Sequence, residues 1–592
     1  MSPPRMVAPL SVADAIASAD GRSALRRFTP LVWRHRRLLG MAIGMSVVSQ
    51  GLQLMVPRVL MRAIDTALVA RTEPLAPYGA AIAVLGLLTW FAVTTQRVNG
   101  HRFAVDLEAD LRTLVQQHIG SLSARFLDQA PTGQLVSRAN EDIKAITLLL
   151  VFGPLMMMSV VTFAGALGIM LSLHVGLTFA ALATLPLVWI TGQRMQRSMF
   201  PVAWLIQSRT GDLATIVEEN LAGAHVVRGM SAEAEQVKSL TRSALRLRWV
   251  NEREIGLRAR YQPLIDNLPR LGMAMVFFYG GYLAIDERLT LGALVAFNAY
   301  LAMIALPLVF VGHLVMLAQR SSAAASRILE VLDERPAILD APDATELEVT
   351  RGAVVFERVT FAYEPDAPVL EEIDLVLEPG ETVALVGSTA SGKTTLARLL
   401  LRLYDPTSGR VLIDGQDIRT VTTASLRSTV SSVLEDPFLF TASVGDNIAY
   451  AVPGANDATV QHAAHIADAE DFISALPSGY DTVVGERGYS LSGGQRQRLA
   501  IARAIAADPL ILILDDATSA IDVHVEQSIH DRLTKARDGR TTLIVAHRWS
   551  TIALADRVVV LDAGRIAADG THAELLASSA LYRQLLAHED EV

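Results

Sequence analysis

The sequence predicts an α-helical domain of six membrane spans with long helical extensions, followed by an α/β domain. Three observations support this division of the 592 residues. Hydrophobic residues make up 51% of the chain and charged residues only 19%, below the roughly 25% typical of soluble domains. Apolar residues gather in long runs in the first half, whereas apolar strands alternate with helices and polar turns in the second. A chain of this length also exceeds one ordinary domain.

The composition excludes several classes of protein. The chain contains no cysteine, which excludes a disulfide scaffold, thiolate zinc sites and thiol catalysis. Its net charge of -9 gives no indication of a nucleic-acid partner. We expect residues 1–21 to form an N-terminal tail, without the basic-then-apolar pattern of a signal peptide. Residues 21–37 are basic with interleaved apolar residues, which suits a short helix at a cytoplasmic membrane surface.

Six apolar runs are long enough to cross a bilayer, for which about 20 residues suffice. An even number of spans places both termini on one side, and the arginines before the first run place that side in the cytoplasm. We therefore expect a multi-pass membrane protein. The excess of arginine over lysine, 48 to 4 of the 52 basic residues, indicates a GC-rich bacterial genome and so a bacterial inner (cytoplasmic) membrane. The transmembrane domain is predicted at 22–325, followed by a linker at 326–352. Its spans are expected at about 38–66, 78–98, 145–173, 175–194, 263–284 and 291–318.

Two polar loops of this domain, 98–144 and 195–260, keep helical apolar spacing, which predicts helices that continue beyond the bilayer on the cytoplasmic side. Charged residues near the span ends, including Arg58, Asp65 and Asp266, are costly in lipid. We expect them to face a cavity or one another, either in contact with a substrate or as structural pairs.

The second domain, 353–592, opens with a phosphate-loop pattern. Residues 387–394 match GxxxxGK[ST] between an apolar strand at 382–386 and a helix at 394–403. Glycines let backbone N–H groups curl around phosphate oxygens. Lys393 would meet the β/γ charge, and the Thr394 hydroxyl would bind Mg²⁺. The expected loop contacts are Gly387, Ser388, Thr389, Ala390, Ser391, Gly392, Lys393, Thr394 and Thr395.

Two further motifs accompany this loop. Four apolar residues form a buried strand that ends at Asp515, whose carboxylate would hold Mg²⁺ through water. The sequence LSGGQ at 491–495 precedes an arginine-rich helix start. Together these motifs resemble those of an ATP-binding cassette (ABC) transporter, specifically an exporter-type half-transporter with six spans and one nucleotide-binding domain. The resemblance covers about 22–590.

The resemblance implies roles for residues that the pattern alone would leave unassigned. Tyr363 matches the aromatic residue that stacks on adenine, and His547 matches the switch histidine that reaches the γ-phosphate. Asp522 lies in the loop that communicates across a dimer of cassettes. Residues 126–142 and 218–223 resemble coupling regions, and 484–488 resembles a segment that touches the membrane domain. Cassettes of this family pair head to tail, and the LSGGQ segment of one chain, called the signature, faces the ATP bound to the other chain. The signature residues expected to contact that ATP are Ser492, Gly493, Gly494 and Gln495.

Two positions depart from the family pattern. Active members carry glutamate as general base after the magnesium aspartate, but this chain has Asp516. Its side chain is one methylene shorter, and a general base must lie within hydrogen-bond reach of its water. Glu435 stands where the family has glutamine. It adds a negative charge and cannot donate hydrogen bonds.

These departures lead to a specific expectation. The chain would be one subunit of a heterodimeric bacterial exporter, with ATP and Mg²⁺ as cofactors. Its own ATP site would turn over poorly, while its signature would complete a competent site on a partner half-transporter. Hydrophobic or amphipathic compounds, or lipids, would be the cargo. The alternatives are a homodimer with Asp516 as base, and an importer built on the exporter fold, for example for a siderophore. Six spans argue against an ATPase of this superfamily that does not transport.

Overall fold

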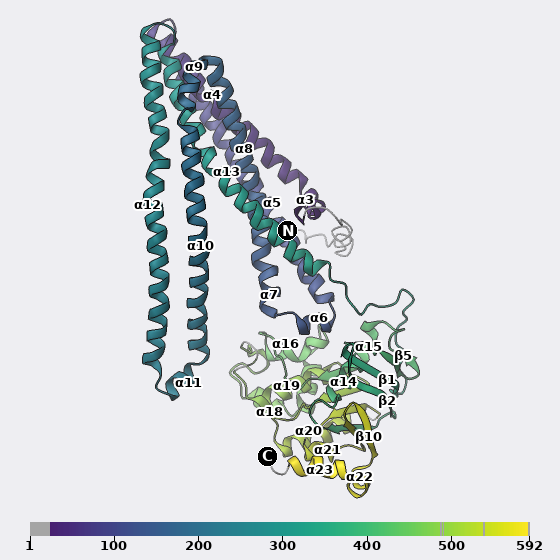
Figure 1. Ribbon diagram of the computed structural model, residues 1–592. Coiled ribbons are helices and arrows are strands. Elements are labelled where there is room, and N and C mark those ends of the chain that lie inside the picture. Colours follow the sequence, from purple (N-terminus) through teal and green to yellow (C-terminus); the bar gives the residue numbers. More distant parts are fainter. Residues whose placement is uncertain (1–23, 486–487, 489, 537–538, 547, 590–592) are drawn as a thin grey trace. The chain divides into compact units, whose positions relative to one another are not determined.

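The computed structural model describes residues 24–485, 488, 490–536, 539–546 and 548–589, apart from the side chains of 154–157 and 305–315. The chain divides into two compact units (Figure 1). The first comprises the chain up to Ser121 together with Pro131–Arg335. The second comprises Leu122–Ala130 and the chain from Pro336.

The first unit is entirely helical in the part described. Five of its helical stretches are long and apolar enough to cross a membrane: Arg36–Val69, Ala76–Ser121, Thr132–Leu173, Val175–Ala222 and Glu233–Ile285. A shorter apolar stretch, Leu291–Ile304, begins the last long helix. The count of six spans and their limits stay a prediction. The helices are α2 (Ala24–Arg27), α3 (Thr29–Arg34), α4 (Arg36–Arg62), η1 (Ala63–Val69), α5 (Ala76–Ser121), α7 (Thr132–Ser137), η2 (Arg138–Asp142), α8 (Ile143–Leu173), α9 (Val175–Leu182), α10 (Leu185–Ala222), α11 (Ala224–Gly229), α12 (Glu233–Ile285) and α13 (Leu291–Leu332).

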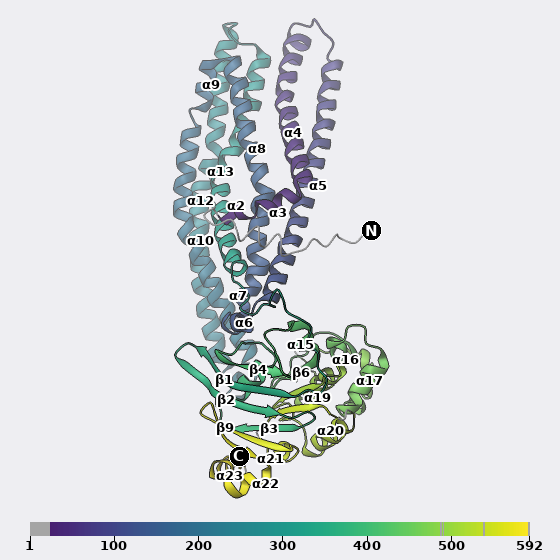
Figure 2. The same ribbon diagram turned by 90° about the vertical axis from the view of Figure 1, so that its right-hand side faces the viewer.

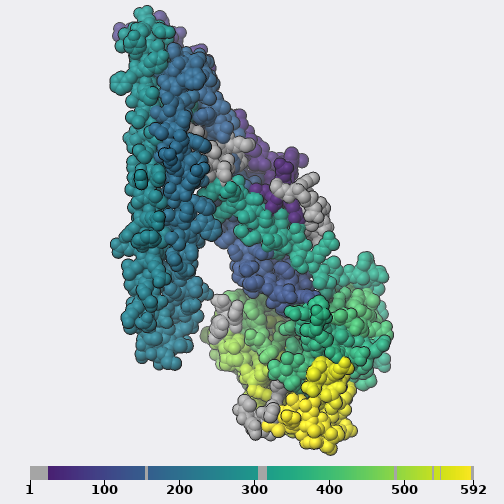
Figure 3. All heavy atoms as spheres, viewed as in Figure 1, coloured from purple at the N-terminus to yellow at the C-terminus, as the bar shows by residue number. Residues whose placement is uncertain are grey.

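Several helices are much longer than a bilayer requires. Helix α12 has 53 residues, which at 1.5 Å per residue is about 80 Å against a hydrocarbon core of about 30 Å. It packs against α10 along its length (Figures 1 and 3). The predicted helical continuation of the spans beyond the bilayer is therefore confirmed as a property of the fold.

Charged residues of the first unit form specific contacts. Asp65, in the π-helical segment η1, accepts hydrogen bonds from the Thr290 hydroxyl at 2.7 Å and from the Gly292 amide at 2.8 Å. It thereby joins the end of α4 to the start of α13, which lie side by side. Asp266 accepts a bond from Gln262 on its own helix. Asp65 thus meets uncharged donors of another helix; that it faces a cavity or another of the charged residues stays a prediction.

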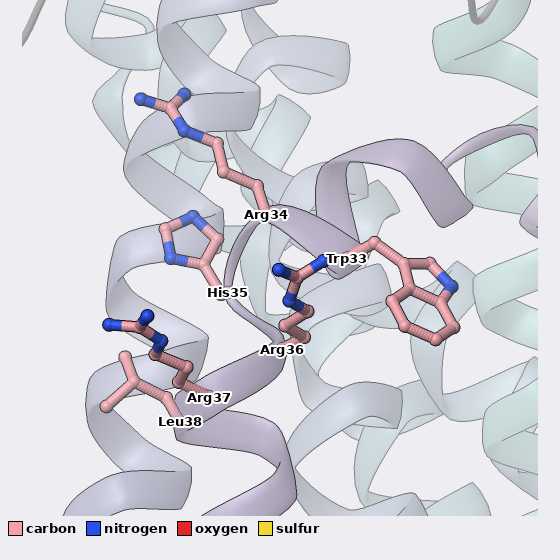
Figure 4. Close-up of a pocket in the computed structure, with 6 residues that line it drawn as sticks. All are labelled: Trp33, Arg34, His35, Arg36, Arg37 and Leu38. Atoms are coloured by element: carbon pink, nitrogen blue, oxygen red, sulfur yellow. The ribbon is translucent and has the colours of Figure 1, made fainter.

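The chain enters this unit through short helices. Helices α3 and α4 meet at His35, whose backbone leaves helical geometry (φ -99°, ψ 21°). Arg34 and His35 both bind Asp110 of α5. Side chains of residues 33–38 fan out around this junction and line a shallow depression of about 500 Å³ (Figure 4). The predicted basic helix is therefore two short helices, α2 and α3.

The second unit contains two sheets (Figure 2). Strands β2, β1, β4 and β5 form an antiparallel sheet, and β10, β9, β3, β8, β7 and β6 form a larger one. In the larger sheet β3 pairs in parallel with β8 and β9, and β7 with β6 and β8. Carboxyl ends of parallel strands meet at one edge, where such sheets bind ligands. The strands are β1 (Val354–Glu364), β2 (Ala367–Leu377), β3 (Thr382–Gly387), β4 (Ser408–Ile413), β5 (Gln416–Asp417), β6 (Val430–Val433), β7 (Ile511–Asp515), β8 (Thr541–Val545), β9 (Arg557–Asp562) and β10 (Arg565–Gly570).

Helices cover this framework and complete two apolar cores. One core lies between the strands and α19, and the other lies between the two sheets and α14. The helices are α6 (Ala124–Gln129), α14 (Lys393–Leu400), α15 (Thr423–Thr429), α16 (Val444–Ile448), η3 (Ala449–Ala451), α17 (Asp457–Ile466), α18 (Glu470–Ser474), η4 (Gly479–Asp481), α19 (Gly493–Ala506), α20 (Val523–Ala536), α21 (Trp549–Ile552), α22 (His572–Ser578) and α23 (Ala580–Glu589).

Helix α6 comes from the first half of the sequence but belongs to the second unit. Ala124 packs on the apolar core. Asp128 accepts a 2.5 Å hydrogen bond from the Tyr404 hydroxyl, and Arg125 donates to the backbone carbonyl of Tyr363 at 2.6 Å. Part of the first predicted coupling region is therefore bound directly to the nucleotide-binding fold.

Candidate nucleotide-binding site

The loop between β3 and α14 has the backbone that a phosphate cradle requires. Gly392 has φ +104°, and Ala390 has φ +66°. A Cβ atom on Gly387 would lie 2.1 Å from the Leu561 carbonyl oxygen, and one on Gly392 would lie 2.5 Å from Leu370 Cδ2. Because neither space can hold a side chain, both positions require glycine. The strand, loop and helix thus follow one another as the sequence predicts.

Two polar side chains of the loop are suited to an anion. Lys393 is 5% exposed and donates to the carbonyls of Gly387 (2.7 Å) and Ser388 (2.9 Å). The Ser391 hydroxyl is buried and has no hydrogen-bond partner among the described residues. A buried hydroxyl without a hydrogen-bond partner costs free energy, and a partner removes that cost. Phosphate oxygens would satisfy both side chains, so the loop fits a nucleotide.

An acidic group lies next to this loop. Asp515 ends β7, is 4% exposed, and accepts a 3.2 Å hydrogen bond from the Thr394 hydroxyl. Burial raises the pKa of Asp515, the Thr394 hydrogen bond opposes this, and the charges of Glu435 and Asp516 raise the pKa further. A buried carboxylate beside a hydroxyl provides the hard oxygen ligands that Mg²⁺ prefers.

The charge of Lys393 depends on the same surroundings. Burial lowers the pKa of its ammonium group, while the nearby carboxylates of Asp515 and Asp516 raise it. The structure therefore brings together the predicted residues at the carboxyl ends of β3 and β7. Glu435, which follows β6, is exposed, and its charge acts on Asp515.

The backbone of Asp516 is fixed. Its φ is +47°, a left-handed conformation that aspartate tolerates better than most residues. Its amide donates a 3.1 Å hydrogen bond to the Val545 carbonyl of the neighbouring strand. This bond ties the main chain at Asp516 to β8 and opposes a shift that would offset the shorter side chain. The carboxylate is therefore set back by about one carbon–carbon bond, roughly 1.5 Å, from where a glutamate would reach.

Tyr363 lies at the end of β1 beside α14. Its hydroxyl is 3.2 Å from the Thr395 hydroxyl. Its ring meets Phe361 and Tyr404 edge to face, with centroids 4.9 and 5.2 Å apart. These contacts from Phe361 and Tyr404 hold the Tyr363 ring beside α14, next to the phosphate loop. Tyr404 could not be found from sequence patterns, because its contact with Tyr363 depends on the packing of distant segments.

The signature motif forms the start of α19. Ser492 caps the helix: its hydroxyl accepts from the Gln495 amide at 3.3 Å, and the Gln495 side chain accepts from the Ser492 amide at 2.9 Å. A Cβ on Gly494 would lie 2.8 Å from the Ala520 carbonyl oxygen, so that position is restricted to glycine. This reciprocal capping box fixes the helix terminus.

The remaining predicted residues are placed as follows. Asp522 is exposed just before α20, and its carboxylate accepts a 2.9 Å hydrogen bond from the His524 amide. His547 lies outside the described residues, as does Glu486 of the segment 484–488. Within the part of the chain that the structure describes, no hydrogen bond joins the signature residues to the phosphate loop.

A multi-pass helical unit joined to a phosphate-loop domain with a signature helix defines a subunit of an ATP-binding membrane transporter. Comparison with known families gives the same assignment. Residues 39–308 match the family model described as ABC transporter transmembrane region, and 370–519 match the one described as ABC transporter. The chain belongs to the ABC transporter family, and the match at 370–519 lies within its second unit.

Similarity to two individual proteins is consistent with this family assignment. The chain is 37% identical over 560 residues to a multidrug efflux ATP-binding/permease protein of Mycobacterium bovis, covering 95% of this chain but 47% of that protein. It therefore spans about half the length of that relative. It is 36% identical to an ATP-dependent lipid A-core flippase of Syntrophus aciditrophicus, covering 86% of this chain and 84% of the flippase.

A solved structure gives the fold. The structure of a bacterial Atm1-family ABC exporter with ATP bound is 30% identical and aligns with a TM-score of 0.77. The alignment covers 94% of this chain and 99% of the exporter. The exporter-type fold predicted from the motifs is thus confirmed.

Proposed function

We propose that this chain is one half of a heterodimeric ABC exporter and that its own ATP site is degenerate. The supporting observation is the fixed backbone of Asp516, with its left-handed φ and its amide bonded to Val545. A carboxylate set back by about 1.5 Å cannot hold the attacking water as a glutamate would. Misplacement of about 1 Å can reduce a rate on the order of 10²-fold.

The other residues of the site would bind ATP normally. Lys393, Ser391 and the loop amides would hold the phosphates, and Tyr363 would stack on adenine. Thr394 and Asp515 would organise Mg²⁺, which neutralises phosphate charge when bound. His547 would stabilise the γ-phosphate. In turnover, water attacks the γ-phosphorus, its proton passes to the carboxylate of Asp516, and the bond to ADP breaks. The set-back carboxylate impairs both the holding of this water and the transfer of its proton.

The signature end of the chain would serve a partner. Helix α19 begins with a complete capping box and closely packed glycines, so its free N–H groups are fixed in position. A helix N-terminus with its dipole attracts phosphate oxygens. We propose that this terminus completes an active site on a second half-transporter. That partner would supply the phosphate loop, the magnesium aspartate and the glutamate after it that this chain lacks.

The proposed cargo is hydrophobic or amphipathic, and a lipid is included in that class. The support is the similarity to proteins named as a multidrug efflux protein and as a lipid A-core flippase. We place the protein in the bacterial cytoplasmic membrane with both termini in the cytoplasm, from the arginines ahead of the first span.

The ATPase rate of the full-length chain alone, in lipid nanodiscs, tests this proposal. ATP binding in the same sample is the control for a folded site. The proposal predicts tight ATP binding with negligible turnover. Fast Mg²⁺-dependent turnover would contradict it and would make the chain a homodimer in which Asp516 serves as base.

A further inference from the structure

A buried carboxyl group that the proposed reaction does not use lies behind the nucleotide site. Glu526, on α20, is 2% exposed. Its Oε1 atom accepts hydrogen bonds from the hydroxyls of Thr518, at 2.6 Å, and Thr551. Its Oε2 atom accepts one from the Ser550 hydroxyl at 2.8 Å. Three donors thus converge on one carboxyl group, and hydrogen bonds to a carboxylate are about twice as strong as those between neutral groups.

The donors come from two different segments. Thr518 lies in the loop 516–522, which follows Asp515, begins at Asp516 and ends at Asp522. Ser550 and Thr551 lie on α21, which begins two residues after His547. Glu526 therefore ties the loop that follows the magnesium aspartate to the segment that follows the switch histidine.

A second side chain makes the same connection from the other segment. Arg548 donates to the backbone carbonyls of Ser519 and Ile521, the latter at 3.1 Å. Carbonyl oxygens of the loop 516–522 are thus held by the residue next to His547 in the sequence. Together, Glu526 and Arg548 bind the two segments through both side chains and main chain.

The same loop is attached to the signature helix. Gln497, on α19 and 3% exposed, donates to the Ser519 hydroxyl at 2.8 Å and accepts from the Ala520 amide at 2.8 Å. Buried networks of this kind hold their members in one arrangement as long as every group is satisfied. Hydrogen bonds therefore run without a break from the signature helix, through the loop 516–522, to the residues beside His547.

We infer that Glu526 is a positioning residue for ATP: it holds the segment after His547 in register with the loop 516–522, and so sets how strongly this chain's own site responds to the γ-phosphate. This inference rests on the proposed ATP site and on the role proposed there for His547. Glu526 acts through those segments and does not touch the nucleotide. Its loss would weaken binding of ATP, which has a γ-phosphate, more than binding of ADP, which does not.

The dissociation constants of ATP and ADP test this inference. They are measured with Mg²⁺ on the full-length chain in nanodiscs, by competition with a fluorescent nucleotide. Glu526→Ala leaves two buried hydroxyls unpaired, and we expect the preference for ATP over ADP to fall about tenfold. Glu526→Gln keeps an oxygen that can accept from Thr518 and Thr551, so it should restore most of the preference.

Matched variants separate positioning from stability. Ser550→Ala removes one hydrogen bond at a half-buried residue and should fold even if Glu526→Ala does not; we expect a smaller loss of preference in the same direction. Thr541→Val removes a buried hydroxyl at the opposite end of β8, which bonds Gly352 and Gly380. It should lower the melting temperature and leave the ATP/ADP ratio unchanged.

The outcomes are distinct. An unchanged ratio in both Glu526→Ala and Ser550→Ala, or equal losses of ATP and ADP affinity that track the melting temperature, would overturn the inference. If the unmodified chain binds neither nucleotide, the proposed function itself fails. If the unmodified chain binds ATP well and only the ratio stays constant, the inference about Glu526 alone is wrong.

Discussion

Restoring the missing methylene at position 516 should restore hydrolysis. In Asp516→Glu the backbone remains held by its bond to the Val545 carbonyl, so the carboxylate advances by about one carbon–carbon bond, roughly 1.5 Å. A general base in reach contributes on the order of 10²- to 10⁴-fold, and a displacement of about 1 Å accounts for on the order of 10². We therefore expect about a hundredfold increase in rate, equivalent to about 2.7 kcal/mol in the activation free energy.

The assay measures phosphate release by the dimeric fraction of the full-length chain in nanodiscs, at saturating ATP. In that dimer, the signature helix of a second copy supplies the facing half of each site. Asp516→Asn is the matched control, because it has the same length and cannot accept a proton as a carboxylate does. Equal rates in the unmodified chain and Asp516→Glu, with ATP bound in both, would refute the geometric reasoning. A double variant with Glu435→Gln would then show whether the extra charge at 435 limits the rate.

Three further predictions concern stability and are checked by unfolding of the full-length chain. Gly292→Ala should lower stability by about 1–3 kcal/mol, because its Cβ would lie 2.3 Å from the Met61 carbonyl oxygen, whereas Gly281→Ala, with nothing within 4 Å, should be neutral or stabilising. Ser492→Ala should cost about 1 kcal/mol by removing the cap of α19, and a melting temperature equal to that of the unmodified chain would contradict the capping box. Asp414→Asn should cost about 1–2 kcal/mol at pH 7, since the carboxylate accepts amide bonds from residues 350–353. Burial tends to raise the pKa of Asp414, but these bonds lower it below the ordinary value. The stability that the ionised carboxylate adds is therefore present above the unfolded-state pKa of about 3.9 and is lost as pH falls through the pKa of the folded state. The difference between the two proteins should therefore shrink in acid.

The sequence predicted those parts of the fold that depend on local pattern. The strand, glycine loop and helix around Lys393 follow from residues that are adjacent in the chain, and the structure forms them in that order. Apolar run length likewise predicted the long helices of the first unit. In both cases the signal and the structure occupy the same short segment, so no distant contact is needed to interpret it.

Contacts between distant segments could not be predicted in this way. Tyr404 lies beyond the end of α14 and meets Tyr363 of β1, so this contact depends on how separate elements pack. The bond from Asp65 to Gly292 joins residues 227 positions apart. Glu526 lies four residues after Asp522, where a glutamate on a polar helix suggests only a solvated face, yet the fold buries it among three hydroxyls. Predicting such contacts requires the arrangement of the sheets.

The backbone of Asp516 is the most consequential case. The sequence shows that aspartate replaces glutamate, but it does not show that the main chain there is left-handed and bonded to β8. That constraint converts a change of one methylene into a displaced carboxylate. It is also the reason that the account predicts an impaired site in place of a slightly rearranged one.

The identity of the nucleotide that stays on the chain tests this account most directly. The full-length chain in nanodiscs, in excess over ATP and with Mg²⁺, is quenched after about one second, when a site of typical rate (about 10 s⁻¹) has turned over and one slowed about a hundredfold has not, and its nucleotide is identified by chromatography. The account predicts that intact ATP remains on the protein, because Lys393 and the phosphate loop bind it and Asp516 does not complete the proton transfer. Recovery of ADP alone would contradict the central claim that this site binds ATP without turning it over.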